Sequence, residues 1–254
     1  MKLRILGCGT SSGVPRIGND WGDCDPAEPR NRRTRASILV EHWGFRILVD
    51  TGPDMRAQLL DAEVAEVDAV IWTHDHADHC HGIDDLRQVY HARGGPVQGF
   101  ARADTVATLQ RRFGYIFSGN GGYPPVASLD ILQDALELGG MRVRVVDQPH
   151  GSISAAGLRF DTDGASIGYS TDCSSLTADM GALFEGVDVW VVDCLRRRPH
   201  PSHPHLAETL GWIAEVKPRR AILTHMDQSM DYAGLVAELP AHVEPGYDGL
   251  EVAL

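Results

Sequence analysis

The stretch WTHDHADHCHG, residues 72–82, places four histidines and two aspartates directly after an apolar strand-like run. Within it the spacing is His-x-His-x-Asp-His, from His74 through His76 and Asp78 to His79. A surface charge cluster is one explanation of such a stretch. Imidazole and carboxylate groups at this density also suit Zn, Mn or Fe, and a single loop carrying four of them can serve two adjacent ions. The spacing therefore predicts a metal site.

Three further candidate ligands follow apolar runs elsewhere in the chain. They are His150 in VVDQPHGS, Asp172 in IGYSTDCSS and His225 in AILTHMDQ. Taken alone, a histidine at such a place is more often a hydrogen-bonded structural residue, and Asp172 could simply cap a helix. Loops at the ends of strands commonly converge on a ligand. The three residues together with the 72–82 stretch therefore favour a metal centre.

Short Val- and Ile-rich runs bounded by Gly, Asp or Pro predict strands, and longer periodic segments between them predict helices. The predicted strands are 2–8, 36–40, 45–49, 67–73, 141–146, 158–161, 166–170, 187–193 and 220–224. The predicted helices are 53–62, 82–92, 103–112, 176–185, 205–216 and 231–238. This order predicts an α/β fold of two mixed β-sheets with helices outside. No repeat or linker divides the chain, so we expect a single domain over residues 1–254.

Composition narrows the class of protein. The chain has 254 residues, of which 43% are hydrophobic, enough for a substantial core and unlike a disordered chain. The net charge of −12 argues against a dedicated nucleic-acid scaffold, which needs clustered Lys and Arg. The N-terminus lacks an apolar signal region, and no run approaches membrane-spanning length. Five scattered cysteines are typical of reduced thiols. We therefore expect a cytoplasmic protein without membrane partners.

Five motifs in order make the chain resemble the metallo-β-lactamase-fold hydrolases. They are LVDTG with Asp50, THDHADH, and the segments around His150, Asp172 and His225. The resemblance covers nearly the whole chain and implies an αββα sandwich. It implies a first metal on His74, His76 and His150, a second metal on Asp78, His79 and His225, and Asp172 as a bridge. Asp50 would orient a ligand histidine through its other ring nitrogen. Asp75 lies at an x position and is not expected to ligate.

The implied cofactors are two divalent ions, Zn or Mn, which make a bridging hydroxide available near neutral pH as the nucleophile. A paired-metal site suits phosphate ester hydrolysis because both the attacking and the phosphoryl oxygens can be stabilised. The same site does not exclude thioester, lactone or β-lactam substrates. The candidate catalytic residues are Asp78, Asp172 and His203.

The substrate class comes from motifs outside the metal ring. The segments LGCGTSSGVPRIG, HPSH and GYDGLEV resemble the PhnP-type phosphodiesterases, which open phosphoribosyl cyclic phosphates. The resemblance implies that His203 in HPSH contacts the phosphate or protonates the leaving group, although an exposed proline-rich turn is the alternative. Arg196, Arg197 and Arg198 are further candidates for binding the substrate phosphate. The basic run at 30–37 could bring Arg33 or Arg35 toward a substrate phosphate, but it is interpreted as a solvated segment leading into a strand.

The chain departs from this family in one place. Relatives hold a structural zinc on closely spaced cysteines, whereas DWGDCDPAE keeps only Cys24, and Gln228 stands where a histidine would complete the site. We therefore expect no third, structural zinc. Hydrogen bonds from Asp20, Asp23 and Asp25 are the expected replacement.

Three other functions stay open. A tRNase Z-like nuclease shares the fold, but its His-Glu-Ala-Thr signature is replaced here by Asp193-Cys194-Leu195-Arg196. A thioester or lactone hydrolase shares the metal ligands. A non-catalytic metal-binding module would use a closed structural site. The favoured function is a dinuclear metal-dependent phosphodiesterase acting on small cyclic phosphodiesters, with no nucleic-acid partner beyond small nucleotides and with a homodimer left open.

Overall fold

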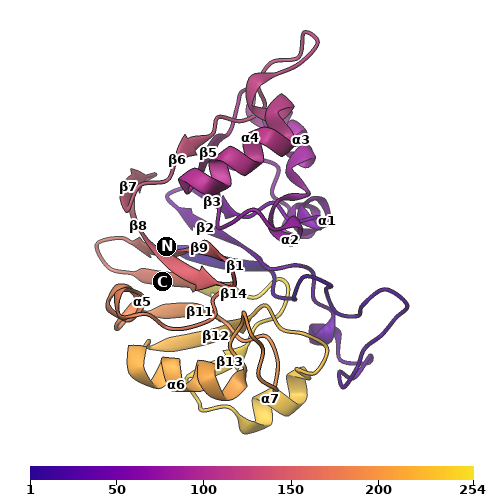
Figure 1. Ribbon diagram of the computed structural model, residues 1–254, viewed down its shortest axis with the longest axis vertical. Helices are drawn as coiled ribbons and strands as arrows, with labels where there is room; N and C mark the ends of the chain where they lie inside the picture. Colours follow the sequence, from indigo (N-terminus) through magenta and orange to yellow (C-terminus); the bar gives the residue numbers. More distant parts are fainter.

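The strands form two seven-stranded sheets in a computed structural model that describes residues 1–254 (Figure 1). In spatial order, the first sheet is β14-β1-β2-β3-β4-β5-β6 and the second is β13-β12-β11-β10-β9-β8-β7. The first contains β1 (Lys2–Gly7), β2 (Ser37–His42), β3 (Phe45–Val49), β4 (Ala69–Trp72), β5 (Gln98–Ala101), β6 (Asp130–Ile131) and β14 (Glu251–Ala253). The second contains β7 (Ala135–Leu138), β8 (Met141–His150), β9 (Ile153–Asp161), β10 (Ser166–Ser170), β11 (Val189–Asp193), β12 (Arg220–Thr224) and β13 (Val243–Pro245).

Helices cover the outer sides of the two sheets (Figure 1). Beside the first sheet lie α1 (Met55–Asp61), α2 (Ala77–Cys80), α3 (Leu86–Arg93) and α4 (Ala103–Ser118). Beside the second lie α5 (Ala178–Phe184), α6 (Leu206–Val216) and α7 (Tyr232–Glu238). Two 3₁₀ turns, η1 (Pro29–Asn31) and η2 (Ile83–Asp85), complete the elements. The predicted αββα sandwich is confirmed. None of the helices combines the length and hydropathy needed to cross a membrane.

Alternating side chains of the first sheet face two different cores. Ile47 and Val49 of β3 belong to the larger apolar cluster, which contains residues of both sheets. Leu48, between them, belongs to the smaller cluster, which also contains residues of α1, α3 and α4. This alternation is the two-residue period of a strand. Because each face meets an apolar layer, the strand reads as an almost continuous apolar run, the pattern from which it is predicted.

Both sheets are mixed. β14, β1, β2 and β3 pair antiparallel, as do β7, β8, β9 and β10. The remaining neighbours, from β3 to β6 and from β10 to β13, pair in parallel. Parallel strands of one sheet end at the same edge, where ligand sites of open α/β sheets usually form. The metal-ligand candidates follow β4, β10 and β12 at these edges.

The observed elements match the predicted ones with specific differences. All nine predicted strands are present, but the sequence did not indicate β5, β6, β7, β13 or β14. The helix predicted at 103–112 continues as α4 to Ser118, with non-helical backbone angles at Phe113. Part of the predicted ligand loop is the one-turn helix α2. The unpredicted strands are short, and all five carry exposed or half-buried positions, so their own sequence gives little periodicity.

Candidate functional site

Sharp turns at strand ends direct the site residues toward one another. Asp50 follows β3, Asp172 follows β10 and His225 follows β12, each in the left-handed region, with φ values of 67°, 53° and 58°. Such a conformation costs a non-glycine residue roughly 1–3 kcal/mol and persists only where the surrounding structure enforces it. Its repetition at three strand ends indicates that the fold maintains this arrangement for a functional reason.

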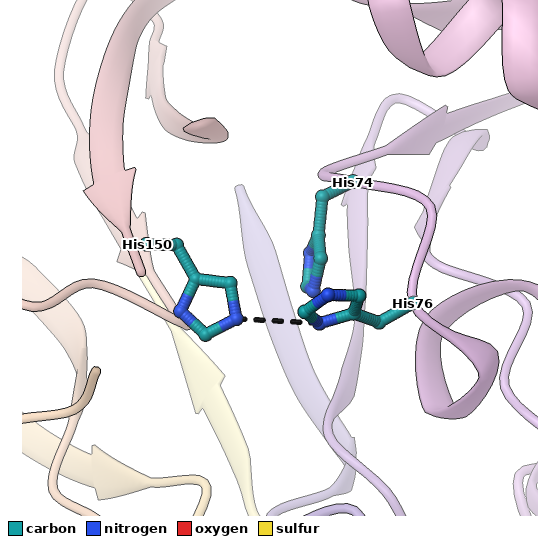
Figure 2. A group of neighbouring side chains, drawn as sticks. All are labelled: His74, His76 and His150. Carbon is teal, nitrogen blue, oxygen red and sulfur yellow. Dashed lines mark hydrogen bonds between the residues drawn. The ribbon is translucent and has the colours of Figure 1, made fainter. Parts of the chain in front are cut away.

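The first group of ligand candidates joins the two sheets. His74 and His76 follow β4 of the first sheet, and His150 ends β8 of the second. One ring nitrogen from each of the three lies within 4.8 Å of the others. Figure 2 shows the three imidazoles converging, with His150 Nε2 and His76 Nδ1 3.3 Å apart. The structure therefore brings together the three residues expected at the first metal.

The second group lies beside the first. Asp78 and His79 lie on α2, and His225 follows β12. The Oδ2 atom of Asp78 is 3.3 Å from His79 Nε2 and 3.6 Å from His225 Nε2. These three residues form a separate cluster whose donor atoms lie within 4.8 Å of one another. The single turn of α2 is what turns both Asp78 and His79 toward the same point.

Asp172 lies between the two groups. Its Oδ1 atom is 3.8 Å from His74 Nε2 and 3.5 Å from His225 Nε2, while its Oδ2 atom is 3.2 Å from His79 Nε2. The same Oδ1 atom is 3.6 Å from His150 Nε2. One carboxylate therefore faces members of both groups, as a bridging ligand must.

The donor chemistry of this cluster fits divalent metal ions. The Nε2 atoms of His74, His79 and His225 are buried and lack a hydrogen-bond partner. Buried polar atoms are normally satisfied, so three such atoms facing carboxylates indicate positions for ligands. The Nδ1 atoms of two of these rings have partners, Thr73 Oγ1 for His74 at 3.0 Å and Asp50 for His79 at 2.7 Å. That division of roles between ring nitrogens is typical of metal-ligating histidines.

Asp50 is completely buried behind the second group. Its Oδ2 atom contacts His79 Nδ1, and its Oδ1 atom accepts a hydrogen bond from the backbone N–H of Thr73 at 2.8 Å. Burial raises the pKa of Asp50, against the opposing effect of the His79 charge and its hydrogen bonds. These contacts fix the ring plane of His79, which lies between Asp50 on one side and the Asp172 carboxylate on the other.

The two groups of histidines differ electrostatically. Burial, followed by the charge of His79, holds the pKa of His74 well below its usual value. Burial also lowers the pKa of His225, but the Asp172 carboxylate and the nearby Asp78 carboxylate outweigh it and raise that pKa to about 9. Without metal, the second group therefore holds protons near neutral pH, whereas His74 is neutral. Since ligands must lose these protons, metal affinity at the second group is expected to fall as pH falls.

His203 lies next to the metal-ligand cluster and has a partner that sequence reasoning missed. Its Nδ1 atom is 2.8 Å from Oδ2 of Asp193, and its Nε2 atom is 3.9 Å from Oδ1 of Asp172. Its ring stacks on His225, with centroids 4.7 Å apart. Asp193 is completely buried at the end of β11. An aspartate closing the apolar strand VWVVD, like Asp50 after β3, was the available signal.

The three consecutive arginines make contacts away from the cluster. The guanidinium of Arg196 donates to the carbonyl oxygens of Arg198 and Pro199, at 3.0 and 2.6 Å. Arg197 pairs with Glu238 at 2.5 Å. Arg198 is exposed. No hydrogen bond or ion pair links any of these guanidinium groups to the metal-ligand candidates, so their binding of phosphate stays a prediction.

The basic run at 30–37 is not simply solvated, and that interpretation is wrong for Arg33. This side chain is 2% exposed, and its guanidinium donates to the carbonyl oxygens of Met230 and Asp227 at 2.6 and 3.4 Å. It also contacts Cys24 Sγ at 3.9 Å. The carbonyl groups that satisfy Arg33 lie almost 200 residues later in the chain, at a separation of 197 for Met230, so the local sequence could not indicate its burial.

The loop around Cys24 is held partly by the aspartates expected there. The side chains of Asp20 and Asp25 accept hydrogen bonds only within their own loop, from the backbone N–H groups of Gly22 and Ala27. The backbone N–H groups of Asp23 and Asp25, however, donate to the carbonyl oxygen of Gln228 at 2.9 Å and to Oδ1 of Asp231 at 3.1 Å, in the loop before α7.

Two side chains that were not expected add to this connection. Asn31 Nδ2 donates to Asp231 at 2.7 Å, and the buried guanidinium of Arg33 donates to the carbonyl oxygen of Met230.

The fold and the arrangement of His and Asp side chains define a metal-dependent hydrolase of the metallo-β-lactamase superfamily. A model of the β-lactamase superfamily domain matches residues 45–226, well over half of the chain. The chain belongs to this superfamily. Metal binding through its His and Asp clusters follows from the fold and the donor set.

Two solved structures are similar to this chain over nearly its whole length. A solved structure described as a new diphosphatase from the PhnP family is 33% identical and has a TM-score of 0.90, covering 99% of this chain and 96% of its own. The predicted resemblance to PhnP is confirmed. The Zn²⁺-bound PqqB from Methylobacterium extorquens has a TM-score of 0.81 over the full length of both chains, but at 18% identity the likeness concerns the fold alone.

Two curated relatives carry other names. The octanoyltransferase of Porphyromonas gingivalis is 30% identical over 263 residues, covering 100% of this chain and 52% of its own length. A ribonuclease Z of Methanopyrus kandleri is 27% identical over 137 residues, covering 49% of this chain and 43% of its own. This chain thus spans about half the length of the curated relatives that it matches.

Proposed function

We propose that the protein is a dinuclear metal-dependent phosphodiesterase that hydrolyses small cyclic phosphodiesters. The observation that carries this proposal is the position of Asp172, whose two carboxylate oxygens face histidines of both ligand groups. A shared carboxylate between two sets of donors is the arrangement that a pair of metal ions requires. The likeness to a PhnP-family diphosphatase supports phosphate chemistry.

The residues around this centre can perform both halves of the reaction. Divalent ions held by the two groups would supply a hydroxide near neutral pH and neutralise charge on the phosphoryl oxygens. Asp193 can only accept a hydrogen bond when ionised, so His203 donates to it through Nδ1. The buried carboxylate thereby holds the imidazole with its Nε2 atom on the side of Asp172, where a proton on that atom can pass to a leaving oxygen.

A general acid at His203 distinguishes this site from a metal site that supplies only the attacking hydroxide. Expelling an alkoxide from a phosphodiester requires protonation of a poor leaving group, and a positioned acid accelerates such steps by about 10²- to 10⁴-fold. His203 is 8% exposed, so it is shielded yet reachable from the cluster. Asp193 fixes its orientation from the interior.

A ribonuclease Z-like activity is the second candidate, because curated relatives of that name match part of the chain. The net charge of −12 and the intramolecular contacts of Arg196 and Arg197 oppose it, since gripping RNA needs free basic groups along the backbone. Thioester and lactone hydrolysis need the same metal ligands. The choice among these substrates calls for direct measurement.

A substrate panel tests the proposed reaction. We expect the metal-loaded protein to hydrolyse bis(p-nitrophenyl) phosphate and a 2′,3′-cyclic nucleotide with kcat/KM at least about tenfold above that for a lactone, a glutathione thioester or a structured RNA. Asp172→Ala protein, purified identically, controls for contaminating enzymes. Faster turnover of the lactone or the thioester would contradict the proposal, and cleavage of the RNA alone would favour the nuclease.

A further inference from the structure

A cavity of about 500 Å³ lies beside the metal-ligand candidates. Its lining includes Asp75, which stands between His74 and His76, and Ser152 and Ile153, which closely follow His150. The first turns of α4 and the residues around β6 form the other walls. The cavity is therefore lined by segments that carry the first ligand group, and its volume is within the range of small-molecule sites.

The cationic groups at this cavity are already paired. Arg102, the one basic residue of the lining, contacts Asp147 at 2.8 Å and Asp134 at 2.8 Å and donates to the carbonyl oxygen of Leu132. Arg112 lies on the other side of Asp75, 3.6 Å from its carboxylate, and donates to its backbone oxygen at 2.6 Å. No guanidinium is left free to meet a second anionic group of the substrate.

Acceptors and hydroxyl groups make up the rest of the polar lining. Asp104, in the first turn of α4, takes part in neither ion pair. Four hydroxyl side chains and one amide complete the polar groups, namely Thr105, Thr108, Ser152, Ser154 and Gln133. Carboxylate and hydroxyl oxygens accept hydrogen bonds from the hydroxyl groups of a ligand, and the Asp104 carboxylate, which has no cationic partner in the lining, repels a phosphate.

We propose that this cavity binds the organic group that remains attached to the phosphate, which in a cyclic diester also bears the leaving oxygen, and that it selects a neutral, hydroxyl-bearing group of about nucleoside size over one with a second phosphate. The inference rests on the proposed phosphodiesterase function and specifies its substrate class. It assigns Asp104 and Thr108 as specificity residues on α4, with Ser154 at the start of β9 as a further residue of the lining. It also separates this protein from an enzyme that acts on diphosphates.

Three esters with the same leaving group test the inference. They are thymidine 5′-(p-nitrophenyl phosphate), its 3′-phosphorylated form and methyl p-nitrophenyl phosphate, all followed by release of p-nitrophenolate. We expect wild-type kcat/KM for the thymidine ester to exceed that for the 3′-phosphorylated ester by about tenfold or more, because like charges would meet in the cavity. Asp104→Arg should reduce this preference at least about threefold. Equal rates for the two thymidine esters in the wild type would overturn the proposal.

Variants that fill the cavity provide a second test of the inference. Thr108→Trp should lower kcat/KM for the thymidine ester about tenfold or more and leave the methyl ester within about twofold. Gln110→Trp, on the same helix and outside the lining, is the matched control and should leave both substrates unchanged. Ser154→Trp repeats the test from another part of the lining if Thr108→Trp does not fold. Equal losses for both esters, or none, would overturn the inference while leaving the proposed function intact. Hydrolysis of none of the three esters would overturn both.

Discussion

Asp172→Ala is expected to lose phosphodiesterase activity by roughly 10³-fold or more. The carboxylate faces both ligand groups, so its removal weakens the positions of both ions at once. Metal-ion stabilisation of a transition state amounts to several kcal/mol, and each factor of ten in rate corresponds to about 1.4 kcal/mol. Kinetics on bis(p-nitrophenyl) phosphate, with bound metal measured in the same preparations, give the comparison.

Asp50→Ala provides a comparison for the loss of activity expected in Asp172→Ala. Asp50 contacts His79 through the ring nitrogen that faces away from the cluster, and the loss of such a supporting contact costs about 10- to 100-fold in affinity or activity. We therefore expect Asp50→Ala to fall between the wild type and Asp172→Ala. Asp84→Asn, whose side chain accepts only from Tyr115, serves as the control for loss of a carboxylate near the ligand loop. Wild-type activity in Asp172→Ala would refute the bridge.

His203→Ala is expected to slow hydrolysis of a 2′,3′-cyclic nucleotide by roughly 10²- to 10⁴-fold in kcat. The cyclic substrate expels an alkoxide, which needs the proton that His203 holds beside Asp172. An aryl ester expels p-nitrophenolate, which is stable without protonation, so bis(p-nitrophenyl) phosphate should be affected much less. The measurement is kcat for both substrates at equal metal occupancy.

The pattern across substrates identifies what His203 does. If the imidazole only contacts the phosphate, both substrates lose alike and mainly through KM. His200→Ala, which removes an imidazole from the same loop, is the matched control and should leave both rates close to wild type. Asp193→Asn should reproduce the leaving-group dependence in weaker form, because the amide changes the hydrogen bond that orients the imidazole. Unchanged kinetics in His203→Ala would show that HPSH is merely a turn.

The elements that could be predicted from the sequence are those whose burial is evident from their own apolar residues. β4 and β11 are completely buried along their length, and their Val-rich runs predict them. The candidate ligands could also be located from the local sequence, because they follow apolar runs. β13 has only three residues, and its pairing with β12 depends on residues that lie far from it in the sequence.

The rest depended on contacts between distant parts of the chain. Arg33 belongs to a basic run that is typical of a solvated segment, yet the carbonyl oxygen of Met230 satisfies it in the interior. The role of Asp193 is apparent only in the folded chain, where the loop after β11 places His203 within hydrogen-bond distance of it. The cavity beside Asp75 is assembled from four separated segments, around Asp75, at the start of α4, around β6, and along β8 and β9, so no single motif indicates it.

The most direct test of a paired-metal phosphodiesterase is a metal titration of the metal-free protein, followed by hydrolysis of bis(p-nitrophenyl) phosphate. Chelated and dialysed protein should be inactive, and added Mn²⁺ or Zn²⁺ should restore turnover to a plateau at two equivalents per chain. Binding at the second group should weaken as pH falls, since the ion there must displace protons from His79 and His225. Full activity without metal, or a plateau at one tightly held equivalent, would contradict the account.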